Sequence, residues 1–444
     1  MSSTPEIAPY TARQRAMIML FSCLGTVLDG ADFAIFLIFL APIAAYFETT
    51  LVNVAIIQAI SYLAGIVGGI VFGMVSDRKG RRLGLILTVG LFSLATLASA
   101  FAPSFGVLLV LRVVAGIGIG GESGIAFSYL MESSPGRSAR RGGASGILQA
   151  MFIVGSILST FTYVQTSAAF GTEAWRAAFV ILGVLGLLAL VLRLFTPESR
   201  VWQARHAESA SGSTTGRVPF REAMRPLMTT RMLLAVLLMT FAFFGAYAVG
   251  TYGASMLQTV FTLEPATVGL VGYTTSAITL VAYLLGGYLA DRLGRRRSFI
   301  VMASIGTVAY LAFGFLSLGA GNSLGSAVIW TSPVIIGYLF IYVGFGYFGA
   351  QGVWLSELFP TAIRSTAQNL AYYVGRGIGA GVLPLVALTI ATGIGADVRL
   401  AIALGVIGTI GTIVFAALLP ETKGIAIDEV GTPAALRASA EFSE

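Results

Sequence analysis

Residues 73–82 read GMVSDRKGRR, and residues 287–296 read GYLADRLGRR. Both segments fit the pattern G-x-x-x-D-R-x-G-R-R, and they lie 214 positions apart in a chain of 444 residues. A single segment of this kind is also typical of a solvated basic turn, but two copies at nearly half the chain length indicate an internal duplication. We therefore expect the second half of the chain to repeat the fold of the first.

Two weaker pairs share nearly the same offset. PESR begins at Pro197 and PETKG begins at Pro420, 223 positions later. Glu132 and Glu357, each at the end of a long apolar stretch, lie 225 positions apart. Three pairs at nearly the same spacing are much stronger evidence of a duplication than the two basic segments alone.

The composition is that of a membrane protein. The chain is 56% hydrophobic and 11% charged, whereas soluble domains carry about 25% charged residues. Uncharged stretches of about 20 residues recur along the chain, and each is long enough to cross a bilayer. The sequence predicts an all-α integral membrane protein with twelve transmembrane helices, at residues 16–47, 53–76, 83–102, 105–131, 142–167, 175–195, 230–258, 266–290, 298–319, 326–355, 366–392 and 398–419.

These helices fall into two sets of six. We predict an N-terminal six-helix bundle in residues 1–195, a linker in residues 196–229, and a C-terminal six-helix bundle with a tail in residues 230–444. A pseudo-two-fold axis should relate the bundles. The linker contains ESASGSTTG, a composition typical of a flexible connection.

The basic residues predict the orientation. Of the 27 lysines and arginines, 23 fall on one side of the predicted helices. The positive-inside rule then places both termini and the linker in the cytoplasm of a cell (inner) membrane. Anchoring to anionic lipid headgroups would account for nearly all of these residues and for the net charge of +7, so no nucleic acid partner is needed. The first apolar run is too long for a signal peptide, so we expect a retained first helix.

The duplicated loops can join neighbouring helices at the cytoplasmic side. The aspartate of each loop could accept hydrogen bonds from a neighbouring helix end, while the arginines bond carboxylates or lipid headgroups. We predict a gating or structural role, without substrate contact, for Asp77, Arg81, Glu122, Glu132, Asp291, Arg295 and Glu357.

Twelve helices, the doubled loop motif and the long central loop resemble the major facilitator superfamily, over about Arg13 to Lys423. The resemblance implies two six-helix bundles built from inverted three-helix repeats. It also implies one binding site near the middle of the membrane, alternating access by rocking of the bundles, and a monomer.

Five ionisable residues lie inside the predicted helices, away from the ends: Asp29, Asp32, Arg112, Glu122 and Arg376. Such charges usually face a cavity or pair with each other, and they are candidates for function. Asp29 should lie about 20 Å from the cytoplasmic start of its helix, and Arg112 about 10 Å from the outer start of its own. Both depths correspond to the same level of the membrane, and Arg376 should lie near the midplane.

Asp29 and Asp32 are three residues apart and therefore neighbours on one helix face. Two close carboxylates in a poorly solvated site should not both stay ionised, and a nearby arginine would favour the charged form. We predict that Asp29 and Asp32, supported by Arg112, couple protons to transport. The alternative is a static ion pair with Arg112 that only locks two helices together.

Arg376 has no acidic neighbour in sequence, which makes it a candidate bidentate ligand for a substrate carboxylate. The alternative is that it pairs with Asp29 or Asp32 across the cavity. Further predicted substrate contacts are polar residues on nearby helices: Tyr373, Asn369, Gln351, Tyr342 and Tyr247. A tyrosine stripe is more often packing than a binding wall.

Shorter motifs narrow the resemblance. LDGADF (residues 28–33) is similar to the D-G-x-D signature of the aromatic acid/proton symporters and to D-G-x-D-F of the sialate/proton symporters. LRVVAGIGIGGESG (111–124) resembles a segment of sialate and related organic-acid carriers, and GRGIGA (375–380) resembles an arginine segment of aromatic-acid carriers. The resemblance implies proton-coupled uptake of a small organic anion, such as an aromatic, sialic or short-chain acid.

Two other hypotheses stay open. One is a sugar or cation porter of the same superfamily, although the predicted seventh helix lacks the paired amides that a polyol ligand would need. The other is a non-transporting sensor or scaffold. We predict no enzyme, no cofactor and no metal site, because nucleotide-binding and nucleophile motifs are missing and the single His206 lies in the linker.

Overall fold

The computed structural model describes residues 10–49, 51–133, 141–210, 229–263, 265–319, 330–360 and 363–424. Twelve helical spans in these ranges are long and apolar enough to cross a membrane, as predicted. The first half contains α1 (Ala12–Ile38), α2 (Leu40–Tyr46), α3 (Leu51–Lys79), α4 (Arg81–Ser99), α5 (Phe105–Glu132), α6 (Arg141–Phe170) and α7 (Ala174–Arg193). The second half contains α10 (Thr230–Ser255), α11 (Pro265–Leu293), α12 (Arg295–Gly319), α13 (Pro333–Gly344), α14 (Tyr347–Leu358), α15 (Arg364–Arg376), α16 (Leu383–Gly393), α17 (Val398–Ala403) and α18 (Gly405–Leu418).

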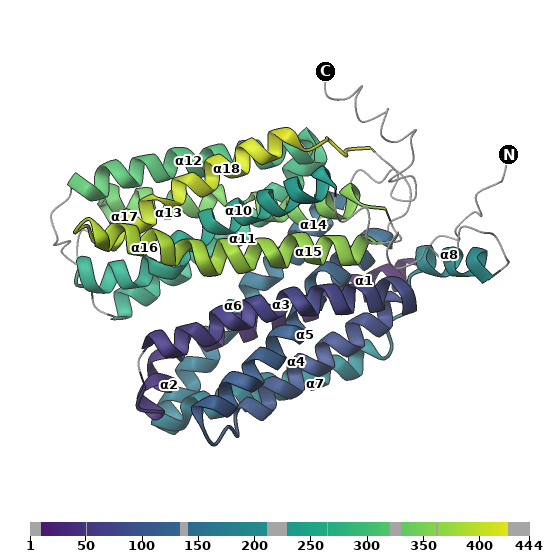
Figure 1. Ribbon diagram of the computed structural model, residues 1–444, viewed down its shortest axis with the longest axis horizontal. Coiled ribbons are helices and arrows are strands. Elements are labelled where there is room, and N and C mark those ends of the chain that lie inside the picture. Colours follow the sequence, from purple (N-terminus) through teal and green to yellow (C-terminus); the bar gives the residue numbers. More distant parts are fainter. Residues whose placement is uncertain are drawn as a thin grey trace.

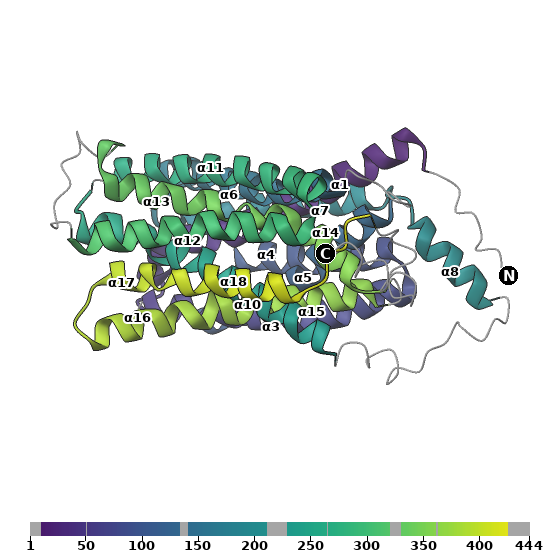
Figure 2. The same cartoon turned by 90° about the horizontal axis from the view of Figure 1, so that it is seen from above.

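The two halves form two helical bundles that lie side by side (Figures 1 and 2). A short helix, α8 (Arg200–Ala210), lies at the end of the molecule where α1 begins and α18 ends (Figure 1). Residues 73–82 and 287–296, the basic loops, contain the turns between α3 and α4 and between α11 and α12. We call the end of the molecule at these turns the basic end. The predicted all-α fold with two six-helix bundles is confirmed.

The bundles touch mainly through α3, α5 and α6 of the first half and α11, α14 and α15 of the second. At the opposite end, the ribbons of α2 and α16 lie apart in Figure 1. The pairing of α3 with α15 and of α6 with α11 repeats the same arrangement in the two halves, as a duplicated chain requires.

Four predicted helices are interrupted, the twelfth only at Leu404, between α17 and α18. The first, expected as residues 16–47, begins earlier, because Thr11 and Gln14 form a capping box at Ala12, and it breaks at Phe39. The tenth was expected as residues 326–355. It consists of α13, which starts at Pro333, and α14; residues 320–329 lie outside the described ranges.

The eleventh predicted helix, residues 366–392, contains a π-helical turn, η5 (Gly377–Val382), between α15 and α16. The turn reads GIGAGV, and Pro384 follows it. Glycine is a weak helix former and proline has no backbone N–H, so both disturb the regular pattern of helical hydrogen bonds. Such turns are frequent at functional sites, and this one directly follows Arg376.

The predicted flexible linker is helical in its first part. Arg200–Ala210 form α8, whereas residues 211–228, which hold most of the ESASGSTTG tract, lie outside the described ranges. The indole nitrogen of Trp202 donates to the backbone oxygen of Asp77 at 3.0 Å, which ties α8 to the first basic loop.

Glycines let α1 approach α6 closely. A Cβ atom at Gly30 would overlap the backbone of Phe152, and one at Gly155 would overlap the backbone of Val27. Small residues at such crossings are typical of membrane helices, which associate through close packing. Because α1 is fixed against α6 at Gly30, the flanking Asp29 and Asp32 are held toward the other helices of the bundle.

Candidate functional site

A narrow cavity of about 20 Å³, room for about one water molecule, lies between the two bundles. Most of its wall comes from the first bundle. It is lined by Asp29, Asp32 and Phe33 of α1, Gln58, Ser61, Tyr62 and Gly65 of α3, Arg112, Gly116 and Ile119 of α5, and Tyr373 and Arg376 of α15. The structure thus brings four of the five predicted intramembrane charges together.

Asp32 and Arg112 form a buried ion pair. Nη1 of Arg112 donates to Oδ1 of Asp32 at 3.0 Å, and Nη2 donates to Oδ2. The hydroxyl of Thr96 donates to the same carboxylate at 2.5 Å. The guanidinium lies 5.2 Å from the ring centroid of Phe36 and 5.6 Å from that of Phe179. A bidentate, aromatic-flanked pair of this kind joins α1 firmly to α5.

Asp29 has no such pair. The hydroxyl of Ser123 donates to its Oδ2 at 3.0 Å, and Oδ1 has no hydrogen-bond partner among the described residues. Ser123 lies in turn 3.3 Å from the hydroxyl of Tyr373, which donates to the backbone oxygen of Ile119 at 2.6 Å. Of the five buried carboxylates in the described residues, Asp29 alone forms no ion pair.

Arg376 stands beside a cage of rings. Its guanidinium carbon lies 4.9 Å from the ring centroid of Phe33, 5.0 Å from that of Tyr62 and 5.6 Å from that of Phe152. The hydroxyls of Tyr62 and Tyr247 interact with it, whereas its Nε has no partner in the described part of the chain. A buried guanidinium flanked by π faces keeps its charge while part of its hydrogen-bonding capacity stays unused.

Arg376 differs from every other fully buried arginine that the structure describes. The others each form an ion pair with a carboxylate: Arg81, Arg112, Arg141, Arg193, Arg295 and Arg364. Among the described residues, no carboxylate oxygen lies within 4.0 Å of the Arg376 nitrogens. The predicted alternative, a direct ion pair of Arg376 with Asp29 or Asp32, is therefore not formed, although the charges of Asp29 and Arg376 interact at longer range.

The other predicted substrate contacts lie in different places. Tyr373 lines the cavity, and Tyr247 packs against Phe33 with ring centroids 5.9 Å apart. Asn369 donates to the backbone oxygens of Gly69 and Gly121, both at 3.3 Å, and so joins the second bundle to the first outside the cavity lining.

Gln351 and Tyr342 do not belong to the lining of this cavity. Gln351 is fully buried in α14, with both amide atoms unpartnered among the described residues. The hydroxyl of Tyr342 lies 3.0 Å from that of Tyr338 within the second bundle. Their predicted contact with substrate stays a prediction.

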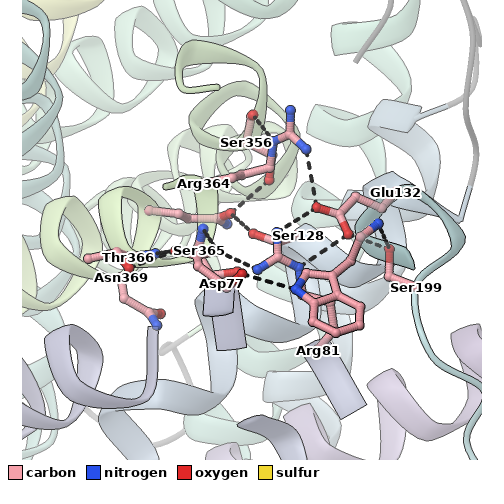
Figure 3. Close-up of polar contacts among 12 residues, drawn as sticks. Asp77, Arg81, Ser128, Glu132, Ser199, Ser356, Arg364, Ser365, Thr366 and Asn369 are labelled. Carbon is pink, nitrogen blue, oxygen red and sulfur yellow. Dashed lines mark hydrogen bonds and ion pairs between the residues drawn. The ribbon is translucent and has the colours of Figure 1, made fainter. Parts of the chain in front are cut away.

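The first basic loop belongs to a network at the basic end (Figure 3). Arg81 donates from Nη2 and Nε to Glu132 at 2.8 and 3.2 Å and also pairs with Asp77. Arg364 of the second bundle reaches the same Glu132 at 3.2 Å. Asp77 accepts the backbone N–H of Thr366 at 3.0 Å, at the start of α15. The predicted hydrogen bond from a neighbouring helix end is present.

The second basic loop repeats this network. Arg295 donates from Nε and Nη2 to Glu357 at 2.9 and 3.0 Å. Arg141 of the first bundle pairs with Glu357 at 3.3 Å. Asp291 accepts the backbone N–H groups of Gly142 and Gly143, each at 2.7 Å, at the start of α6. The two networks fasten the bundles together at the basic end.

Several arginines expected at lipid headgroups are inside the protein. The buried ones at or near the basic end are Arg81, Arg141, Arg193, Arg295 and Arg364. The expectation of headgroup anchoring is wrong for Arg141, Arg193 and Arg364, because each meets a carboxylate on another helix. For Arg81 and Arg295 the other expected partner, a carboxylate, is present. Arg193 pairs with Glu122, which also accepts the hydroxyl of Thr88 at 3.0 Å. Glu122 is thus part of a closed pair within the first bundle.

The sequence reading missed several residues of the site. Thr96 and Ser123 hold the two aspartates, and neither has a signal of its own in an apolar helix. By contrast, Gln58, Ser61 and Tyr62 lie at spacings of three and four residues, so a polar stripe on α3 could have been recognised.

Comparisons with known proteins agree with the fold. The sequence profile of the Major Facilitator Superfamily matches residues 22–384. The chain is 30% identical over 390 residues to a cis,cis-muconate transport protein of Acinetobacter baylyi, covering 84% of this chain and 89% of that protein. It is 28% identical over 417 residues to a probable 4-methylmuconolactone transporter of Cupriavidus pinatubonensis, covering 92% and 91%.

Among solved structures, a proton:xylose symporter bound to 6-bromo-6-deoxy-D-glucose superposes with a TM-score of 0.80 at 21% identity, covering 95% of this chain and 99% of that one. At this identity the likeness concerns the fold alone. The fold and the family profile are those of a membrane transporter. The chain belongs to the major facilitator superfamily, and it is a multi-pass membrane transporter and not an enzyme.

Proposed function

We propose that the chain takes up a small organic carboxylate together with protons, by alternating access. The observation that carries this proposal is the state of Arg376: a buried cation at the cavity, with no carboxylate within 4.0 Å among the described residues. A buried charge without a partner is costly, and a substrate carboxylate would supply that partner.

The relatives support an organic acid. Cis,cis-muconate carries two carboxylates on a planar diene, and 4-methylmuconolactone carries one carboxylate beside a lactone ring. The relatives named as transporters of these two acids align along most of this chain. The rings of Phe33, Tyr62 and Phe152 around Arg376 offer flat apolar surface for such molecules, as π faces stack well on conjugated systems.

Asp29 and Asp32 are the proposed proton carriers. Asp29 lines the cavity without an ion pair, so it can gain a proton without leaving an arginine uncompensated. Asp32 can gain a proton at low cost only when another anion binds Arg112 in its place. Arg112 therefore supports coupling as a positioning residue, and the static lock remains the competing interpretation for the Asp32–Arg112 pair alone.

The proposed orientation places the basic end in the cytoplasm of a cell (inner) membrane. In the arrangement described, hydrogen bonds from Asp77 and Asp291 and ion pairs from Glu132 and Glu357 hold the bundles together at that end. Uptake would require these contacts to break while the bundles of residues 1–195 and 230–444 rock about the cavity. Tyr373 and Tyr247 would then move with the bundle of residues 230–444, which also carries Arg376.

Uptake into proteoliposomes tests the proposal. The purified chain should accumulate labelled cis,cis-muconate or benzoate when the outside is acidic, and a protonophore should abolish accumulation. Arg376→Gln should lose this uptake, whereas Arg176→Gln, a control outside the cavity, should keep it. Accumulation that resists the protonophore would refute proton coupling, and full carboxylate uptake by Arg376→Gln would refute the proposed anion site.

A further inference from the structure

The cavity contains two arginines and two aspartates and no other charged side chain in its lining. In the ionised state these charges sum to zero. Arg112 and Arg376 each retain an Nε with no hydrogen-bond partner among the described residues. Two guanidinium groups at one small cavity, each with an unused donor, can serve two acceptor groups of one ligand.

Each aspartate also has a hydroxyl partner. Thr96 donates to Asp32 at 2.5 Å, and Ser123 donates to Asp29 at 3.0 Å. A hydroxyl can donate to a carboxylate or accept from a carboxylic acid, so either partner can stay bonded after its aspartate gains a proton. The site therefore contains two arginines, two aspartates and two hydroxyls. Arg112, Asp32 and Thr96 are bonded to one another, whereas in the second set Ser123 bonds Asp29 and Arg376 interacts with Asp29 only at longer range.

We propose that the substrate is a dicarboxylate bound at both arginines, and that one proton enters the site for each substrate carboxylate. One carboxylate binds Arg376. The other replaces Asp32 at Arg112, while Asp32 takes a proton and turns to Thr96. Asp29 takes the second proton and remains bonded to Ser123. The inference deepens the proposed function and rests on it, since it assigns the class of substrate and the coupling ratio of the same cavity.

Charge balance supports the ratio. A dianion entering without protons would leave two net negative charges in a poorly solvated cavity, which is strongly unfavourable. Two protons neutralise Asp29 and Asp32, so two arginines face two substrate carboxylates and the sum stays zero. A monocarboxylate needs one proton by the same argument. Transport of either acid then moves no net charge across the membrane.

The surroundings leave these two aspartates as the groups that change charge. Glu122 also interacts with Asp29, but it is held by Arg193. The remaining ionisable neighbours of the Asp29 side are tyrosines, including Tyr247 and Tyr373, whose phenols stay neutral in ordinary pH ranges.

A matched pair of acids tests the coupling ratio. Trans,trans-muconate and sorbate share a six-carbon diene and differ in one carboxylate. Uptake of each into proteoliposomes that contain a pH dye gives the protons carried per acid, and imposed potentials report net charge. We expect two protons for muconate and one for sorbate, with neither uptake responding to the potential. One proton with muconate, and a response to the potential, would overturn the proposal.

A double variant tests the second arginine. Asp32→Asn/Arg112→Gln removes the pair without leaving a lone buried charge, and it should weaken muconate binding relative to sorbate binding by about tenfold or more. The control Glu122→Gln/Arg193→Gln removes a buried pair that does not line the cavity, so it should affect both acids equally. An unchanged preference for muconate in the first variant would overturn the proposal.

Different results would refute the dicarboxylate site and the proposed function. If sorbate enters with one proton and depends on Arg376 but muconate is neither bound nor carried, the proposed function stands and the dicarboxylate site is refuted. If neither acid is carried and Arg376→Gln changes nothing, the proposed function itself is refuted.

Discussion

The basic end and the central cavity both contain buried arginines and carboxylates, but they are built differently. At the basic end the arrangement occurs twice: Arg81 and Arg364 meet Glu132, and Arg295 and Arg141 meet Glu357. In the cavity, the charges occur once. The α10 sequence has no acidic residue to match the aspartates of α1, and α6 has no charge beyond Arg141 to match Arg376.

The difference separates architecture from function. Charges kept in both halves after the duplication are fully paired, and they fasten one bundle to the other. Of the charges present in one half only, Asp32–Arg112 and Glu122–Arg193 form ion pairs, whereas Asp29 and Arg376 form none among the described residues. These two unpaired groups line the cavity between the bundles. A buried ionisable group that has lost its symmetry mate and lacks a partner is the better candidate for a ligand or a proton.

The largest expected effect is at Arg376. Arg376→Gln should lower carboxylate uptake by about 100-fold, corresponding to loss of a charge-assisted contact worth about 3 kcal/mol. Thermal unfolding should change little, since no ion pair is broken. Arg376→Lys keeps the charge but not the two-pronged geometry, so partial uptake should remain. Equal uptake by the wild type and the glutamine variant would contradict the assignment of Arg376 to substrate binding, and the cavity would then not differ in function from the basic end.

The repeated networks should respond alike. Glu132→Gln or Glu357→Gln removes the carboxylate that two buried arginines share, and breaking such a pair typically costs about 3–5 kcal/mol. Both variants should lower the unfolding temperature in detergent by similar amounts. If one variant were strongly destabilised and the other were not, the two halves would not be equivalent at this end.

The two aspartates should differ from each other. Asp29→Asn breaks no ion pair, so the protein should fold normally, exchange substrate across the membrane and fail to accumulate it. Asp32→Asn leaves Arg112 without its partner, so it should also lose stability, by about 3 kcal/mol. Parallel measurements of exchange, proton-driven accumulation and thermal unfolding give both readouts. Equal stability of the two variants would contradict the assigned pairing.

The smallest effect concerns Glu198, which caps α4 by accepting the backbone N–H of Arg81 at 2.8 Å. Burial raises the pKa of Glu198 above its ordinary value of 4.5, so the folded state holds this proton more tightly than the unfolded state. Its contribution to stability is therefore present at low pH and is lost as the pH rises through the folded-state pKa. Glu198→Gln should flatten this part of the stability–pH curve, with a change of about 0.5 kcal/mol at neutral pH.

The sequence was sufficient for the fold because its signals are local or repeated. Apolar length predicts each span, and the two basic loops reveal the duplication. It also indicated which charges lie inside the membrane. The partners of these and other buried charges were harder to predict from the sequence. Arg364, for example, pairs with Glu132, which lies 232 positions away. The interruption of the eleventh helix at η5 was missed because glycine weakens a helix without dictating where it changes form.

The site was predictable in part for the same reason. Asp29, Asp32, Arg112 and Arg376 stand out as charges in apolar helices, but nothing in their spacing says which aspartate Arg112 chooses. Phe152 lies on α6 and reaches Arg376 only because the bundles meet at this level. Contacts between the halves depend on tertiary arrangement, and no periodicity within one helix encodes them.

Equilibrium binding tests the role of Arg376 most directly. Labelled cis,cis-muconate should bind the purified wild-type chain with uptake of protons from the buffer, and Arg376→Gln should bind it about 100-fold more weakly at every pH. Binding of equal strength to both proteins, or binding that takes up no proton, would contradict a carboxylate held at Arg376 with the aspartates as proton carriers.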